Sequence, residues 1–246
     1  MSIIKLDGYN LSLEDLIKVS RFNHKVELTE NAVERIKKSR AIVDDLVENE
    51  KVSYGITTGF GKFSDVVISK KDTHKLQINL IRSHACGVGN PLSEEIVRAM
   101  MLLRINALSK GYSGIRLETL QILIDMLNKG VHPIVPEKGS LGSSGDLAPL
   151  SHMVLTMIGE GEAIYKGEKM SSKDALEKAG IKPLEYLSSK EGLSLNNGTQ
   201  CMTAIGAITA YDAINLMKTA DIALGLTMEG LNGITCAMDE RVHLVR

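Results

Sequence analysis

Apolar residues recur at intervals of three and four along much of the chain, which is the spacing of one face of a helix. In the stretch from 30 to 50, apolar side chains stand at positions 33, 36, 43, 46 and 47, and Thr29 is placed to cap the first turn. The same signals predict helices over about 93–111, 117–128 and 171–180, and helices that begin at Ser12 and Asp146. Lys25–Thr29 is predicted to be a brief strand, and the prolines at 133 and 136 predict extended backbone.

From Thr199 onward the chain is apolar on every side of a helix. Such a helix must be buried by neighbours, and a chain of this length offers few helices to surround it. We therefore expect burial in a large helical bundle shared between subunits. The whole pattern predicts a mainly α protein, with a helical N-terminal domain over residues 1–196 and the start of a central bundle over 197–246. Residues 239–246 carry no terminating signal, so we expect the bundle to be cut within the domain.

The composition argues against several classes of partner. The chain has 246 residues, is 43% hydrophobic and carries a formal net charge of −1, so its charge favours neither nucleic acid nor an anionic membrane surface. Its first ten residues lack the basic-then-apolar pattern of a signal peptide. The cysteines at 86, 201 and 236 are too scattered for a disulfide framework or a zinc site, and the histidines show no metal-ligand spacing. We expect a cytoplasmic chain with reduced thiols and no metal.

The run Gly139–His152 contains a serine between a small residue and a glycine, and such a triplet can react with its own backbone. Gly145 has no side chain, so its amide nitrogen can approach the carbonyl carbon of Ser143 closely. Attack at that carbon with loss of water closes a five-membered imidazolone ring, and dehydration of Ser144 leaves a methylene conjugated with it. The product is a carbon electrophile that ordinary side chains do not provide. Most triplets of this kind are simple turns or helix entries, so the surrounding sequence has to decide.

Three further runs combine polar residues with glycines. Tyr54–Lys62 is predicted to be a mobile loop, and its tyrosine is either a packing anchor or functional. A phosphate-binding loop needs serine or threonine after its Gly-Lys pair, and here Phe63 follows, so that function is excluded. In Ser83–Gly89, His84 is either structural or a polar contact for a ligand. Glu191–Gln200 fits a polar turn that caps the long helix with an asparagine or a threonine. Neither glycine-rich loop fits a nucleotide motif, so no nucleotide cofactor is expected.

Taken in their order along the chain, the four runs resemble those of the aromatic amino acid ammonia-lyases. The resemblance covers essentially all 246 residues. It implies an L-aspartase-like, mainly α fold and a prosthetic group, 4-methylideneimidazole-5-one (MIO), formed from Ser143, Ser144 and Gly145. Tyr54 matches the base that removes the substrate β-proton, and Asn197 matches the asparagine that contacts the prosthetic group or the substrate. The chain departs from the family at three positions. Ser143 stands where the family has alanine, Thr57 where it frequently has asparagine, and Asn196 where the residue is commonly apolar.

A Ser-His pair at 83–84 is typical of histidine ammonia-lyases, whereas phenylalanine-specific members carry apolar residues there. The resemblance therefore implies elimination of ammonia from L-histidine to give urocanate, in histidine degradation, with His84 bound to the substrate ring. Complete members are longer homotetramers whose C-terminal parts supply further active-site groups, so we expect this N-terminal portion alone to be weakly active or inactive. Two alternatives stay open: a tyrosine or phenylalanine ammonia-lyase or aminomutase of the same family, and a non-catalytic helical scaffold.

Overall fold

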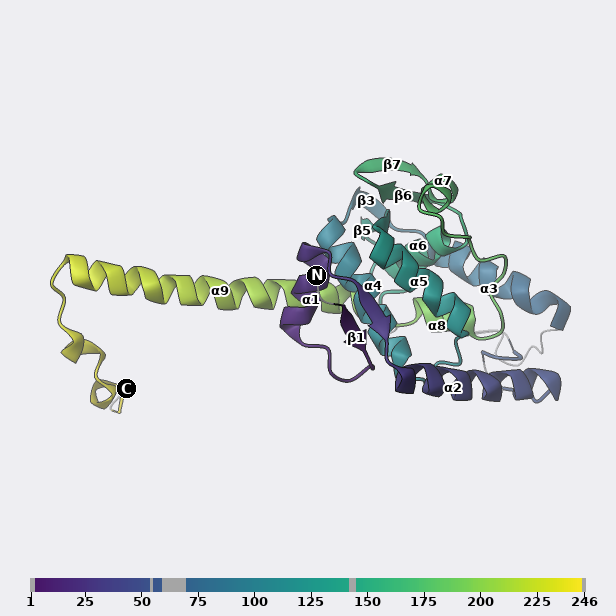
Figure 1. Cartoon of the computed structure of the whole chain (residues 1–246), viewed down its shortest axis with the longest axis horizontal. Helices are drawn as coiled ribbons and strands as arrows, with labels where there is room; N and C mark the ends of the chain where they lie inside the picture. Colours follow the sequence, from purple (N-terminus) through teal and green to yellow (C-terminus); the bar gives the residue numbers. More distant parts are fainter. Residues whose placement is uncertain (1–2, 54, 59–69, 142–144, 245–246) are drawn as a thin grey trace. The chain divides into compact units, whose positions relative to one another are not determined.

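The computed structural model describes residues 3–53, 55–58, 70–141 and 145–244, and the predicted mainly α fold is confirmed (Figure 1). The helices are α1 (Leu13–Phe22), α2 (Glu30–Glu48), α3 (Lys70–His84), α4 (Glu94–Ser109), α5 (Leu117–Lys129), α6 (Leu147–Met157), α7 (Ser172–Lys178), α8 (Glu191–Asn196), α9 (Gln200–Gly230) and α10 (Glu240–His243), with a 3-10 turn η2 (Thr235–Met238). The strands are β1 (Ile4–Leu6), β2 (Val26–Leu28), β3 (Val88–Pro91), β4 (Val131–Pro133), β5 (Pro136–Lys138), β6 (Glu162–Tyr165) and β7 (Glu168–Ser171). Residues 1–205 form one compact unit and residues 206–246 a second. The domain boundary between 196 and 197 stays a prediction.

Side-chain caps open several helices at the residues that the sequence pattern indicates. Ser12 Oγ accepts an amide hydrogen from the first turn of α1 at a donor–acceptor distance of 3.0 Å. Thr29 Oγ1 does the same for α2 at 3.3 Å. Ser93 and Ser171 cap α4 and α7 in this way. At the other end of α5, Gly130 stops the helix with φ +75°, a left-handed conformation that glycine adopts without steric cost.

α3 is absent from the predicted helices because polar residues occupy much of its buried face. Thr73, Gln77 and Ile81 are buried at intervals of four residues, and only one of them is apolar. A helix of this kind shows no hydrophobic stripe in the sequence. Gln77 Oε1 accepts the amide hydrogen of Gly192 at 2.8 Å, so the buried amide is used to hold α8 against α3. α8 is itself a correction, because residues 191–196 form a short helix where the sequence suggests a polar turn; the turn follows at 197–199.

The described strands form three small sheets. β1 and β2 pair in parallel, and β2 confirms the predicted strand at 25–29. β4, β6 and β7 form an antiparallel sheet, and α7 lies beside β6 (Figure 1). β3 pairs with β5 in an antiparallel register that sets Val88 opposite Lys138. This last pairing matters for the site, because it brings the segment after His84 beside the segment that leads into Gly139.

α4 contributes much of the core of the first unit and packs against α1, α2 and α5 (Figure 1). Its apolar side chains are almost wholly buried: Val97, Ala99, Met100, Met101, Leu102, Ile105 and Leu108. Two arginines of the same helix are buried as well, with Arg98 2% and Arg104 5% exposed. A buried guanidinium is tolerated only where acceptors meet its donors, so each arginine marks a place where α4 holds another segment.

Much of α9 is exposed, because few of the described residues pack against it. Beyond residue 205, Leu216 and Met217 each have 70% of their surface exposed, and Ile222 and Leu226 have 65% and 68%. So many exposed large apolar side chains on one helix are typical of a protein–protein interface. The predicted burial of this helix in a larger bundle stays a prediction. Among the helices described, none combines the length and the apolar character that crossing a membrane requires.

Candidate active site

The loop between β5 and α6 carries the predicted ring-forming triplet, of which the structure describes only the last member. Ser143 and Ser144 lie outside the described residues, as does Tyr54. Gly145 is buried and has φ +87°, a left-handed conformation that disfavours other residues. A Cβ added to Gly145 would overlap the carbonyl oxygen of Gly198. Only glycine therefore fits at the end of the triplet, and it lies directly against the turn that precedes α9.

Asp146 connects this loop to the start of α9. Its side chain is fully buried. Its amide donates to Gly198 O at 2.6 Å, its Oδ1 accepts the hydroxyl hydrogen of Ser140 at 2.6 Å, and its Oδ2 accepts the amide hydrogen of Met202 at 2.9 Å. The last bond caps the N-terminus of α9, where a carboxylate is favoured by the helix dipole. The sequence indicates Asp146 only as a helix start, because nothing local shows that it caps a helix more than fifty residues away.

The segment Ser83–Gly89 is held against the same loop. His152 Nε2, on α6, accepts the amide hydrogen of Gly87 at 3.1 Å. Burial lowers the pKa of His152, which favours the neutral ring that this bond needs. A Cβ on Gly139 would lie 3.0 Å from the Cα of Gly87, so the two chains run in close contact. The sequence assigns His152 no chemistry; here it fixes the segment that carries His84.

His84 is the last residue of α3 and is half-buried. Its Nδ1 lies 2.8 Å from the carbonyl oxygen of Leu80, which can only accept. Nδ1 therefore carries the hydrogen, and the neutral ring presents Nε2 as an acceptor. Ser83 Oγ donates to the same carbonyl at 2.9 Å and lies 3.1 Å from His84 Nδ1. The Leu80 carbonyl thus fixes the tautomer of His84.

Asn197 is exposed at the turn between α8 and α9, whereas its neighbour Asn196 is fully buried. Asn196 Nδ2 donates to Ser151 Oγ at 3.3 Å, and its Oδ1 is buried with no hydrogen-bond partner in the structure. Through Gly198 the turn touches Gly145. The structure therefore brings together three of the four predicted runs, those around positions 84, 145 and 197.

The fourth run, around Tyr54, is described only in part. The amides of Ile56 and Thr57 donate to Ser53 O at 3.1 and 3.0 Å, and Thr57 Oγ1 donates to Lys51 O at 2.7 Å. These are turn hydrogen bonds among the described residues of this run. Thr57, at the position where the family frequently has asparagine, uses its hydroxyl for the bond to Lys51 O. Tyr54 and residues 59–62 lie outside the described residues, so the predicted loop stays a prediction.

Three arginines hold the segment that precedes α9. Arg40 Nη1 donates to Ser189 O at 3.0 Å. Arg116 Nη2 and Nε donate to the Oε2 of Glu191 at 2.7 and 3.0 Å, and the Glu191 carboxylate is fully buried. Arg104 donates to Ser194 O, near the end of α8, and to Gln200 Oε1, at the start of α9. The sequence shows no motif for these arginines, because their acceptors lie on segments remote in the chain.

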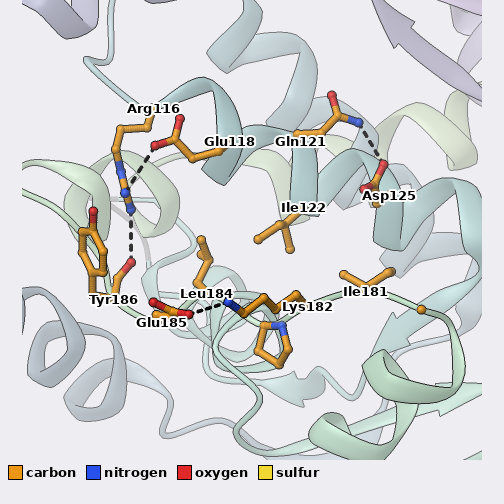
Figure 2. A pocket seen from close by; sticks show the side chains of 12 residues that line it. Arg116, Glu118, Gln121, Ile122, Asp125, Ile181, Lys182, Leu184, Glu185 and Tyr186 are labelled. Carbon is orange, nitrogen blue, oxygen red and sulfur yellow. Dashed lines mark hydrogen bonds and ion pairs between the residues drawn. The ribbon is translucent and has the colours of Figure 1, made fainter.

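A pocket of about 450 Å³ lies between α5 and the segment 180–186 (Figure 2). Figure 2 shows Arg116 directed along the ring of Tyr186, and the guanidinium carbon lies 4.4 Å from the ring centroid. An ion pair between Lys182 and Glu185 lies at its edge. The described lining includes none of the predicted site residues, so the pocket is no part of the candidate site. Within the described residues, no group of three or more metal-ligating side chains comes together.

Residues 11–246 match the family model described as aromatic amino acid lyase. The chain belongs to this family. It is 67% identical to the histidine ammonia-lyase of Alkaliphilus oremlandii over 246 residues, which cover all of this chain and 48% of that protein. It is 61% identical to the histidine ammonia-lyase of Alkaliphilus metalliredigens over the same length and the same shares. The chain thus spans about half the length of these aromatic amino acid lyases.

Solved structures of similar lyases and aminomutases have the same fold. Histidine ammonia-lyase from Trypanosoma cruzi is 38% identical with a TM-score of 0.91, over all of this chain and 48% of that one. Phenylalanine aminomutase from Pantoea agglomerans is 39% identical with the same score, over 100% and 47% of the two chains. The ergothionase of Treponema denticola is 38% identical, also at 0.91, over 100% and 49%. The resemblance to an N-terminal portion of these enzymes is confirmed, but the equal scores do not select a substrate.

Proposed function

We propose that this chain, as the N-terminal portion of a complete protein, eliminates ammonia from L-histidine to give urocanate in histidine degradation. The observation that carries the proposal is the convergence of three segments remote in the sequence: the end of α3 with His84, the loop ending at Gly145, and the turn with Asn197. In an aromatic amino acid lyase these are the segments expected to act on the substrate. The three cysteines are unpaired, which fits the proposal of a cytoplasmic protein.

The proposal includes an MIO group formed from Ser143, Ser144 and Gly145. The described flank fits this group, because Gly145 has the left-handed backbone and the close approach to Gly198 that only glycine allows. Ring closure joins Gly145 N to the carbonyl carbon of Ser143 and expels the carbonyl oxygen as water. Loss of the Ser144 hydroxyl and its Cα hydrogen as a second water leaves the exocyclic methylene. The finished group supplies an electrophilic carbon that makes loss of ammonia from the substrate possible.

Tyr54 is proposed to take the β-proton of the substrate. An ordinary phenol has a pKa near ~10 and is mostly protonated at neutral pH, so the assembled site has to favour the phenolate. Tyr54→Phe keeps the size of the side chain and removes the hydroxyl. We expect this variant to lose turnover while it still loses two waters from its mass, because Tyr54 acts after the ring has formed. Absence of the ring in Tyr54→Phe would contradict the proposal that Tyr54 acts only after the ring has formed.

Asn197 is proposed to donate a hydrogen bond to negative charge that develops in the site. Its side chain is exposed at the turn beside Gly145, so an amide donor stands at the surface of the candidate site. The positive end of the α9 dipole is already met by the buried Asp146 carboxylate, so the Asn197 amide is the donor proposed to favour a transition state in which negative charge grows.

His84 is proposed to select the substrate. Its fixed tautomer leaves Nε2 as an acceptor, which matches a ring N–H of histidine. Phenylalanine has no such hydrogen, and tyrosine carries its hydroxyl at the far end of a larger ring. A site with an unmet acceptor discriminates against a substrate that lacks the donor.

The complete protein is proposed to be a homotetramer that acts on a small amino acid, with its active site finished by groups outside this chain. The exposed apolar side chains of α9 support the assembly, because other helices would remove them from water. We expect this portion alone to be weakly active or inactive. Turnover of histidine by the isolated portion at the rate of the complete protein would contradict that expectation.

Intact mass and substrate preference test the proposal in the complete protein. We expect the wild type to be two waters lighter than its sequence and to prefer histidine over tyrosine and phenylalanine. Ser144→Ala cannot undergo the serine dehydration and is the control for the mass. His84→Phe should lower kcat/KM for histidine by roughly tenfold, the value of one hydrogen bond of about 1.4 kcal/mol. His84→Gln, which keeps an acceptor, is the matched control; equal losses in the two variants would contradict the role of His84.

A second candidate is an aminomutase or a tyrosine or phenylalanine ammonia-lyase. The fit to the phenylalanine aminomutase of Pantoea agglomerans, at 39% identity and a TM-score of 0.91, favours keeping it. Product analysis separates the two, because an aminomutase retains the amino group in a β-amino acid whereas a lyase releases ammonia and an acrylate. A non-catalytic scaffold would show neither product and no loss of water.

A further inference from the structure

Arg104 is a buried guanidinium without a carboxylate partner in the described structure. It lies in α4 with 5% of its surface exposed. Its Nη1 donates to Gln200 Oε1 at 2.8 Å, its Nη2 donates to Ser194 O, and its Nε is buried with no partner. Burial lowers the pKa of Arg104 to about 10, so the group is still charged at neutral pH. A charge kept in the core at this cost needs a reason beyond filling space.

The two acceptors of Arg104 lie on either side of the turn that carries Asn197. Ser194 belongs to α8, and Gln200 is the first residue of α9. Between them, a Cβ on Gly198 would overlap both the Nη1 of Arg104 and the Oε1 of Gln200. The backbone of Gly198 is therefore pressed against the arginine on one side.

The opposite side of Gly198 faces the ring-forming loop. Its carbonyl oxygen accepts the amide hydrogen of Asp146 at 2.6 Å. The same oxygen fills the space that a Cβ on Gly145 would need. Arg104, Gly198 and Gly145 are thus joined by two close contacts, which lead from the helix in the core to the last residue of the triplet.

We propose that Arg104 is a positioning residue for formation of the ring: it fixes the turn at Gly198 by binding Ser194 and Gln200 on either side, and the Gly198 carbonyl in turn holds Gly145 where its amide nitrogen attacks the carbonyl carbon of Ser143. This inference rests on the proposed function, because it assumes that the triplet cyclises. Arginine suits the task since its planar group donates to two acceptors in different directions at once. Lysine offers one charged atom on a flexible stem and cannot hold both sides of the turn.

Arg98 provides a matched control in the same helix. It is 2% exposed, and its Nε and Nη2 donate to Val19 O at 3.0 and 2.8 Å, while its Nη1 donates to Leu127 O at 3.1 Å. Both arginines are therefore buried in α4 and bound to main-chain carbonyls. Arg98 makes none of its hydrogen bonds to the loop that carries the triplet or to the turn before α9. Loss of Arg98 should cost stability without touching ring formation.

The test compares Arg104→Met and Arg98→Met in the complete protein. Each variant is purified, its folding is checked by circular dichroism and urea unfolding, and its loss of two waters is followed over time by intact mass. We expect Arg98→Met to lose both waters at the wild-type rate. Arg104→Met should lose them more slowly by roughly tenfold or more, the factor that one charge-assisted hydrogen bond contributes to an equilibrium. Folded Arg104→Met that cyclises at the wild-type rate would overturn the inference.

Two further variants keep the test decisive. If Arg104→Met does not fold, Gln200→Leu removes only the acceptor of Nη1 and should also slow the loss of water. Wild-type cyclisation in Gln200→Leu would then overturn the inference. Arg104→Lys should restore folding more than it restores cyclisation. A wild-type protein with no loss of water is a different result, because it contradicts the proposed MIO group itself.

Discussion

Protonation of His132 is expected to destabilise the fold as the pH falls below 6.5. His132 lies in β4 with 6% of its surface exposed. Its Nε2 lies 3.1 Å from Nη1 of Arg98, which can only donate, so Nε2 must be an acceptor in the folded state. Burial, and then the positive charge of Arg98, lower the pKa of His132 to about 4. The ring is therefore neutral in the folded protein above about pH 4.

The size of the effect follows from the two pKa values. Above pH 6.5 the ring is neutral in both the folded and the unfolded chain, so it contributes nothing to the pH dependence. Between pH 6.5 and 4 the unfolded chain binds a proton that the folded chain does not, and each pH unit costs about 1.4 kcal/mol. The loss is thus about 2 kcal/mol at about pH 5 and approaches about 3 kcal/mol below pH 4.

Urea unfolding at about pH 7.5 and about pH 5 measures this loss directly. His132→Gln keeps an acceptor for Arg98 but does not titrate, so its unfolding free energy should fall by about 2 kcal/mol less than that of the wild type over this interval. His243→Gln, the same substitution at an exposed histidine outside β4, is the matched control. Parallel profiles for the wild type and His132→Gln would refute the reasoning.

Three more predictions follow from the site. Glu191→Ala leaves the guanidinium of Arg116 without its buried counter-charge and should cost about 3–5 kcal/mol in the free energy of unfolding, measured with urea; a loss near zero would contradict the role of this pair. Asp146→Ala removes the tie between the loop and α9, so its intact mass should retain one or both waters; full cyclisation would count against the tie. His152→Phe removes the acceptor for the amide of Gly87 and should raise KM for histidine more than it lowers the free energy of unfolding; an unchanged KM would leave His152 a purely structural role.

Much of the helical framework could be predicted from local sequence. A serine or threonine before an apolar stripe is a signal within one turn of helix, and Ser12, Thr29 and Ser93 cap the helices that they predict. The same approach missed α3, because Gln77 lies on its buried face and makes its contact with α8. A polar residue satisfied by a remote partner looks, in the sequence, like a residue on the surface.

The candidate site divides in a similar way. The residues proposed to carry chemistry, at positions 54, 84, 143–145 and 197, were chosen from runs whose members are adjacent in the chain. The groups that hold those runs together were not, because Asp146, His152 and Arg104 act on partners more than fifty residues away. Asp146 shows this most clearly: it stands where a helix starts, yet its carboxylate caps α9.

By itself, the sequence determined which groups are available for the proposed chemistry: a triplet proposed to cyclise, a phenol, an imidazole and an amide. It also determined most of the helices, through their own caps and apolar faces. The tertiary structure decided which of these groups meet. Close packing of glycines against backbone, at Gly145 and Gly198, and buried charges that find acceptors across the fold bring three of the four runs to one place. Such contacts form between residues that are remote in the chain. A pattern of neighbouring residues along the sequence therefore does not predict them.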